Sequence, residues 1–124
     1  MTRKRRTQRL RRVDEVLRQV VSDALLERAD PRLDGVVVTG VEASADVAHA
    51  QVFVQAPTNE HRRARAFDAL ERARPTIQAR INGEMHLRLT PVLHFVVDET
   101  IERALRIEQL LADHRPVYPE GEPE

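Results

Sequence analysis

The first long segment of the chain repeats apolar residues at three- and four-residue spacings, which is the pattern of an amphipathic helix. It predicts a helix over residues 7–28. The apolar stripe of this helix consists of Leu10, Val13, Val16, Leu17, Val20, Val21, Ala24 and Leu25. Proline pushes the residue before it out of the helical region, so we expect the helix to end at Asp30 and Pro31.

A second helical pattern lies on both sides of Pro75. Before the proline it predicts a helix over about 63–73, and after it a shorter helix over about 76–82 that ends at Asn82 and Gly83. Proline lacks the helical donor and clashes with the preceding turn, yet it suits the first turn of a new helix. We therefore expect two short helices joined by a sharp bend at Ala73, Arg74 and Pro75.

Three segments read as strands. A β-branched run over 36–41 is followed by a polar turn at Ser44 to Asp46 and by an alternating segment over 47–55, which together predict an antiparallel hairpin. The apolar run 92–97 is short enough for a buried strand. It follows a long helical crossover, so we place it in the same small sheet.

The last helical pattern begins after Asp98 or Thr100, both candidate N-caps, and ends at His114 to Pro116. Its apolar face consists of Ile101, Ala104, Leu105, Ile107, Leu110 and Leu111. The predicted fold class is α+β: helix, strand, strand, bent helix pair, strand, helix, with the helices covering one face of a three-stranded sheet. We divide the chain into a basic tail (1–6), one domain (7–115) and a disordered acidic tail (116–124).

Charge is distributed unevenly along a chain whose formal net charge is zero. Residues 1–12 contain seven basic side chains and no acidic one. Cations near a helix N-terminus oppose the helix dipole, so helix stability explains this cluster poorly, whereas a polyanionic partner would offset the cost. A charged tail kept for solubility is the alternative explanation.

Several classes of function are disfavoured. The chain has no cysteine, its five histidines fall in no metal-binding spacing, and its glycines form no phosphate loop. We expect no catalysis, metal or cofactor. No segment has the length of a membrane span, so we expect a cytoplasmic protein. We also expect it to be a monomer. The three phenylalanines are assigned to packing, which favours contact with a nucleic-acid backbone over base stacking.

Two separated blocks of sequence resemble the ribosome-binding factor A family. The first contains Asp30 to Leu33, Val38 to Glu42, Ser44, Asp46 and Ala50 to Val54. The second contains Leu87 to Phe95, Asp98, Ile101 to Arg103 and Ile107 to Leu111. The resemblance covers about residues 10–111.

This resemblance implies a type II KH-like domain that binds the small (30S) ribosomal subunit and 16S rRNA during late maturation and rRNA processing, without catalysis. The family's Ala-x-Gly motif between two helices aligns with Ala73-Arg74-Pro75, so proline replaces the glycine. Gln51 and Gln78 stand where a basic residue is common. The residues expected to bind RNA are Arg3, Lys4, Arg5, Arg6, Arg9, Arg12, Arg72, Arg74, Arg80 and Arg88.

Two other functions remain open from the sequence. A KH-like protein with non-ribosomal RNA clients would bind free RNA as well as it binds ribosomal particles. A protein-interaction module would lack the steep salt dependence that accompanies neutralisation of phosphates.

Overall fold

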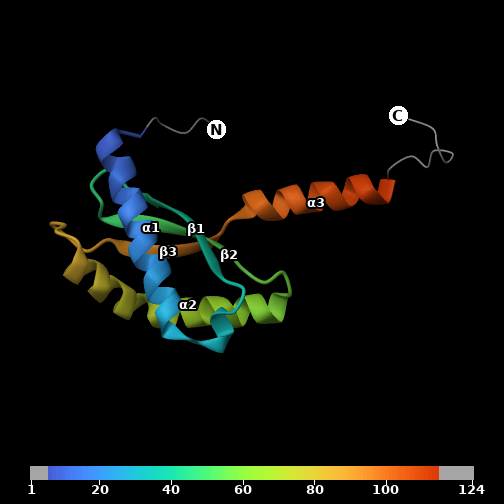
Figure 1. Cartoon of the computed structure of the whole chain (residues 1–124), viewed down its shortest axis with the longest axis horizontal. Coiled ribbons are helices and arrows are strands. Elements are labelled where there is room, and N and C mark those ends of the chain that lie inside the picture. The colour runs from blue at the N-terminus through green and yellow to red at the C-terminus, as the bar shows by residue number, and fades with distance from the viewer. Residues whose placement is uncertain (1–5, 115–124) are drawn as a thin grey trace.

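The computed structural model describes residues 6–114, apart from the side chains of residues 101–106, 113 and 114 (Figure 1). The elements are α1 (Gln8–Arg28), a 3-10 turn (Pro31–Leu33), β1 (Val37–Ala43), β2 (His49–Gln55), α2 (Glu60–Glu84), β3 (Val92–Val97) and α3 (Glu99–His114). The strands form one sheet in the order β1-β2-β3, with β1 and β2 antiparallel and β2 and β3 parallel. The predicted α+β class, the antiparallel hairpin and the three-stranded sheet are confirmed.

The core lies between one face of the sheet and the two helices α1 and α2. Ala50, Val52 and Val54 alternate along β2 and are buried on that face, as the sequence predicted. They meet Leu17 and Val21 of α1 in one cluster of buried residues. The residues between them on β2, including Phe53, point to the opposite face of the sheet.

The predicted break at Pro75 is wrong, because α2 continues through the proline as one helix of 25 residues. Proline within a helix costs roughly 3 kcal/mol. The compensating feature is a stripe that crosses the proline without interruption and is fully buried. The stripe consists of Ala66, Ala69, Leu70, Ala73, Ile77 and Ile81. Pro75 itself is exposed, so water can reach the carbonyl that loses its donor. In Figure 1 the ribbon of α2 changes direction along its length.

The prediction that the last helix covers the sheet together with the others is wrong for α3. This helix leaves the body of the domain beyond the end of β3 (Figure 1). Ile107 and Leu111 are 52% and 62% exposed. Only Asp98 separates β3 from α3, so no loop turns the helix back over the sheet. The predicted contributions of Ile101, Ala104 and Leu105 lie outside the described side chains.

Asp14 of α1 holds the beginning of the chain and the end of β1 together. Its carboxylate accepts hydrogen bonds from the backbone N–H of Ala43 at 2.8 Å and from Nε of Arg6 at 2.7 Å. Arg6 also donates to the carbonyl oxygen of Ala43 at 2.7 Å. The side chain of Asp14 is only 13% exposed, so water competes little for these bonds.

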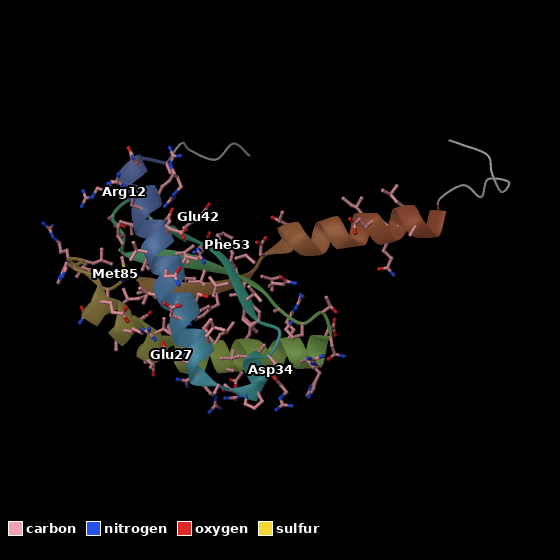
Figure 2. The ribbon with its side chains drawn as sticks, in the orientation of Figure 1. Arg12, Glu27, Asp34, Glu42, Phe53 and Met85 are labelled. Carbon is pink, nitrogen blue, oxygen red and sulfur yellow. The ribbon has the colours of Figure 1, made fainter. Side chains whose placement is uncertain are left out.

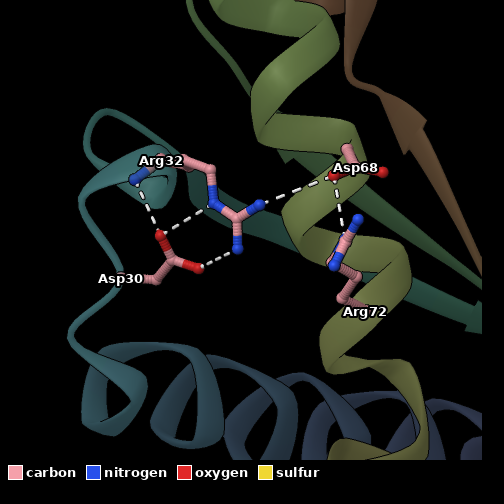
Figure 3. A network of polar contacts seen from close by, with 4 residues as sticks. All are labelled: Asp30, Arg32, Asp68 and Arg72. Carbon is pink, nitrogen blue, oxygen red and sulfur yellow. Dashed lines mark hydrogen bonds and ion pairs between the residues drawn. The ribbon is translucent and has the colours of Figure 1, made fainter.

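The 3-10 turn is tied to α2 by a chain of ion pairs (Figure 3). Asp30 accepts hydrogen bonds from the backbone N–H and from the guanidinium of Arg32, at 2.9 and 2.8 Å. Arg32 reaches Asp68 of α2 at 3.5 Å, and Asp68 also accepts a bond from Arg72 at 3.0 Å. The hydrogen bonds from the side chain and then the backbone of Arg32 lower the pKa of Asp30 to about 2.

Replacing Asp14 by alanine leaves the N–H of Ala43 and the guanidinium of Arg6 without their shared acceptor. We expect the free energy of unfolding to fall by about 1–3 kcal/mol, measured by urea denaturation. The matched control is Glu15→Ala, which removes an exposed pair with Arg18 from the same helix and should change stability far less, because solvent screens that pair. Equal losses in the two variants would contradict an anchoring role for Asp14.

Asp30 should make part of the stability depend on pH. Its pKa is lower in the folded state than in the unfolded chain, so its contribution is fully present above about pH 4 and is lost as the pH falls through about 2. We expect Asp30→Asn to destabilise the domain most above pH 4, with the difference from the original chain shrinking toward pH 2. Urea denaturation at several pH values measures this difference, and a difference independent of pH would refute the prediction.

Candidate nucleic-acid interface

Three segments meet at one end of the domain, which we call the turn end: residues 6–12 at the start of α1, the β1–β2 turn (44–48) and the loop before β3 (85–91). Arg6 and Asp14 connect the first segment to Ala43, immediately before the turn. The N–H of Val92 then donates to the carbonyl of Ala48 at 2.9 Å, which places the end of the third segment against the turn. In Figure 1 the start of α1 and this loop lie toward the same side of the molecule.

The turn end holds the predicted RNA-binding residues whose charge is not neutralised. Arg9 and Arg12 in the first turns of α1, and Arg88 in the loop before β3, are exposed and have no ion pair with any described residue. Arg12 is labelled in Figure 2. Arg3, Lys4 and Arg5 lie outside the described residues, and the described chain starts at this end with Arg6.

The predicted RNA-binding residues on α2 are all paired with carboxylates. Arg72 pairs with Asp68 at 3.0 Å and Arg74 pairs with Glu71. Arg80 pairs with Glu27 of α1 and with Glu84 at 2.5 Å, and these bonds raise its pKa. Arg6 is paired with Asp14 in the same way. A neighbouring carboxylate cancels much of the field that would attract a phosphate.

Arg74 of α2 is partly buried, with 32% of its side chain exposed. It immediately precedes Pro75, and its Nε is buried without a hydrogen-bond partner among the described residues. The structure brings the motif residues Ala73, Arg74 and Pro75 together on α2, with only Ala73 fully buried in the core.

Arg62 and Arg65 were not among the predicted residues. Both are exposed near the start of α2 and, within the described part of the chain, neither forms an ion pair. They line a shallow hollow together with Arg32. The sequence could have indicated that Arg62 is unpaired, because no acidic residue lies three or four positions from it. Arg65 has Asp68 three positions away, but in the structure Asp68 pairs with Arg32 and Arg72.

The two glutamines that replace basic residues have different environments. Gln78 accepts a hydrogen bond from the backbone N–H of Leu93 at 3.0 Å and so connects α2 to β3. Gln51 lies exposed on the face of the sheet away from the helices, opposite His94 in the register. His94 forms a 2.9 Å contact with His49, and their rings are stacked with centroids 5.2 Å apart.

Over the residues that the structure describes, no three His, Cys, Asp or Glu side chains gather closely enough to hold a metal ion. In the same range, no helix has the length and apolar character needed to cross a membrane. The candidate site therefore consists of exposed arginines and the elements that position them. Unpaired guanidinium groups fit the oxygens of phosphates.

Comparison with known sequences identifies relatives over most of the chain. A family model described as ribosome-binding factor A matches residues 9–111. Ribosome-binding factor A of Nitrosospira multiformis is 37% identical over 102 residues, which is 82% of this chain and 81% of that protein. The Halothermothrix orenii protein of the same name is 38% identical over 105 residues, 84% of this chain and 86% of its own length.

Solved structures agree with the sequence relatives. A solution structure of a Thermotoga maritima ribosome binding factor A aligns with a TM-score of 0.67 and 28% identity, covering 81% of this chain and 96% of that one. Coordinates of Thermus thermophilus ribosome binding factor A, a homology model fitted into a cryo-electron microscopy map of a complex with the 30S subunit, align with a TM-score of 0.56 and 25% identity. The alignment covers 68% of this chain and 90% of that one. With its sheet, its helices and nearly its whole described length matched, the chain belongs to the ribosome-binding factor A family.

Proposed function

We propose that this protein is a cytoplasmic, monomeric assembly factor that binds the 30S subunit and 16S rRNA during late maturation and rRNA processing, without catalysis. The observation that supports this most is the likeness to the Thermus thermophilus factor, which was fitted into a map of its 30S complex. We extend 30S binding from that protein to this one because the two chains share a fold. The arrangement of charges then indicates which surface makes the contact.

The turn end is the surface that we propose to meet rRNA. Arg9, Arg12 and Arg88 contact phosphates there, and Arg3, Lys4 and Arg5 extend the same contact. Arg72, Arg74 and Arg80 contribute less, because Asp68, Glu71, Glu27 and Glu84 already satisfy them. Phosphate contacts position a protein on RNA without reading its sequence. Selectivity for the subunit therefore comes from the shape of the folded rRNA that the turn end fits.

A pair of charge-matched variants tests this assignment. The triple variant Arg9→Gln, Arg12→Gln, Arg88→Gln should weaken co-sedimentation with 30S subunits. It should also reduce the slope of log affinity against log salt by about 2, since each lost phosphate contact contributes about 0.7. The control Arg72→Gln, Arg74→Gln, Arg80→Gln removes the same charge from paired residues and should leave that slope unchanged. Circular dichroism verifies that both variants fold.

The same assay can overturn the proposal. A larger loss in the control than in the test variant would move the interface to α2. Equal affinity for free 16S rRNA fragments and for immature and mature 30S subunits would indicate a general RNA-binding protein. Binding to 30S subunits that does not respond to salt would indicate docking on a protein surface.

A further inference from the structure

A second group of arginines lies where the 3-10 turn packs against the start of α2. Arg62 and Arg65 are three residues apart on α2, so their side chains extend from the same side of the helix. Together with Arg32 of the 3-10 turn they line a hollow, which Pro31 and Pro57 complete. We call this site the proline hollow. Because proline has a fixed φ, the backbone on two sides of the hollow has little freedom to rearrange.

The two arginines from α2 bring positive charge that no described carboxylate cancels. Arg62 and Arg65 are exposed, and neither forms an ion pair within residues 6–114. Glu60 is the acidic residue nearest to Arg62 along the chain, but it is two positions away, a spacing at which helical side chains do not face each other. Both guanidinium groups are therefore available to a ligand.

Arg32 forms the opposite wall of the proline hollow and is already held in place (Figure 3). Its guanidinium donates to Asp30 from Nε at 3.2 Å and from one terminal nitrogen at 2.8 Å. The other terminal nitrogen lies 3.5 Å from Asp68. All three nitrogens are engaged, so Arg32 shapes the hollow while Arg62 and Arg65 supply the free donors. A wall that is ordered before binding reduces the entropy lost when a ligand enters.

The chemistry of the hollow fits the backbone of a nucleic acid. Planar guanidinium groups bind phosphate oxygens with two parallel hydrogen bonds, and two of them one helical turn apart can hold one phosphate or two successive phosphates. The lining contains no aromatic ring on which a base could stack and no large aliphatic side chain. Protein interfaces are usually centred on such anchors, so RNA is favoured over an acidic protein surface.

The proline hollow and the turn end lie at opposite ends of α2. Arg65 is nineteen residues before Glu84, where α2 ends, which is up to about 28 Å along the helix. Arg88 lies in the loop beyond that end. In Figure 1 the start of α2 and the loop before β3 are on opposite sides of the molecule. Successive phosphates of one strand advance about 3.4 Å in a duplex, so the two sites contact phosphates that are far apart on the RNA.

We propose that the proline hollow is a second phosphate-binding site, at which Arg62 and Arg65 hold an rRNA segment other than the one at the turn end. The domain then joins two rRNA segments across the length of α2 and restricts their relative movement. The inference rests on the proposed function for the identity of the RNA, whereas phosphate binding by the hollow does not depend on it.

The salt dependence of 30S binding tests this site. In the variant Arg62→Gln, Arg65→Gln we expect the slope of log affinity against log salt to fall by about 1.4, since each lost phosphate contact contributes about 0.7. The control Arg62→Lys, Arg65→Lys keeps both charges and should keep the slope. A second control, Arg18→Gln, removes an arginine that pairs with Glu15 and should also leave the slope unchanged. Co-sedimentation measures the affinities, and circular dichroism verifies that each variant folds.

Combination with the turn-end variant tests whether both sites are occupied at once. The chain with Arg9→Gln, Arg12→Gln and Arg88→Gln in addition to Arg62→Gln and Arg65→Gln should lose about 3.5 from the slope, which is the sum of the separate effects. A combined loss no larger than that of the turn-end variant alone would overturn the second site.

A short oligouridylate separates failure of the hollow from failure of the proposed function. The salt series on this RNA is carried out in the turn-end variant, with and without Arg62→Gln and Arg65→Gln. If the original chain binds no 30S subunit but the oligouridylate slope still falls by about 1.4, the hollow binds phosphate and the 30S function is wrong. If the original chain binds 30S subunits but neither slope changes, the hollow is wrong and the 30S function stands.

A photo-cross-linker identifies the partner at the hollow. Ala64 is exposed and lines a neighbouring hollow together with Arg32 and Arg65. With p-benzoylphenylalanine in place of Ala64, irradiation of the complex with immature 30S subunits should join the chain to 16S rRNA. A cross-link to a ribosomal protein alone would overturn rRNA binding here and assign the hollow to an acidic protein surface. The absence of any cross-link would overturn both assignments.

Discussion

Burial of one stripe of α2 against α1 and the sheet is the constraint on which the domain depends. The stripe mixes small residues, such as Ala66 and Ala73, with the larger Leu70, Ile77 and Ile81, all fully or almost fully buried. Small residues let the two helices approach closely, while the larger ones fill the space above the sheet. Because the stripe spans Pro75, the helix continues through the proline although it lacks one hydrogen bond there.

Local pattern was sufficient to predict most of the fold. The alternation along β2 and the stripe of α1 each arise from neighbours in the sequence. Both sets supply buried core residues, although Val16 of the α1 stripe is exposed. The continuation of α2 through Pro75 depends on packing between segments that are distant in the sequence. A local rule about proline could not include the free energy of burying Ala73 and Ile77 together. For α3, the apolar stripe is visible in the sequence, but its burial against the sheet would need a reversing loop, and only Asp98 separates β3 from α3.

The candidate interface was predictable only in part, because it also depends on contacts between segments that are distant in the sequence. The sequence shows where arginine is abundant, whereas attraction for a polyanion depends on which guanidinium groups lack a carboxylate. Arg72 and Arg74 have acidic residues at helical spacing, so their pairing was foreseeable. The contact between Arg80 and Glu27 joins α1 to α2 and could be seen only in three dimensions. The 20 basic and 20 acidic residues thus cancel unevenly over the surface.

The parallel pairing of β2 with β3 has a consequence for the order of folding. The β1–β2 hairpin can form as soon as residue 55 is available, whereas β3 must wait for the whole of α2 to bring it back beside β2. During synthesis the N-terminal elements emerge first, so the edge of β2 stays unpaired until residue 97 has left the ribosome. An unpaired strand edge can pair with other chains. The interval between the completion of α2 and the arrival of β3 is therefore the stage at which this chain is most exposed to misassembly.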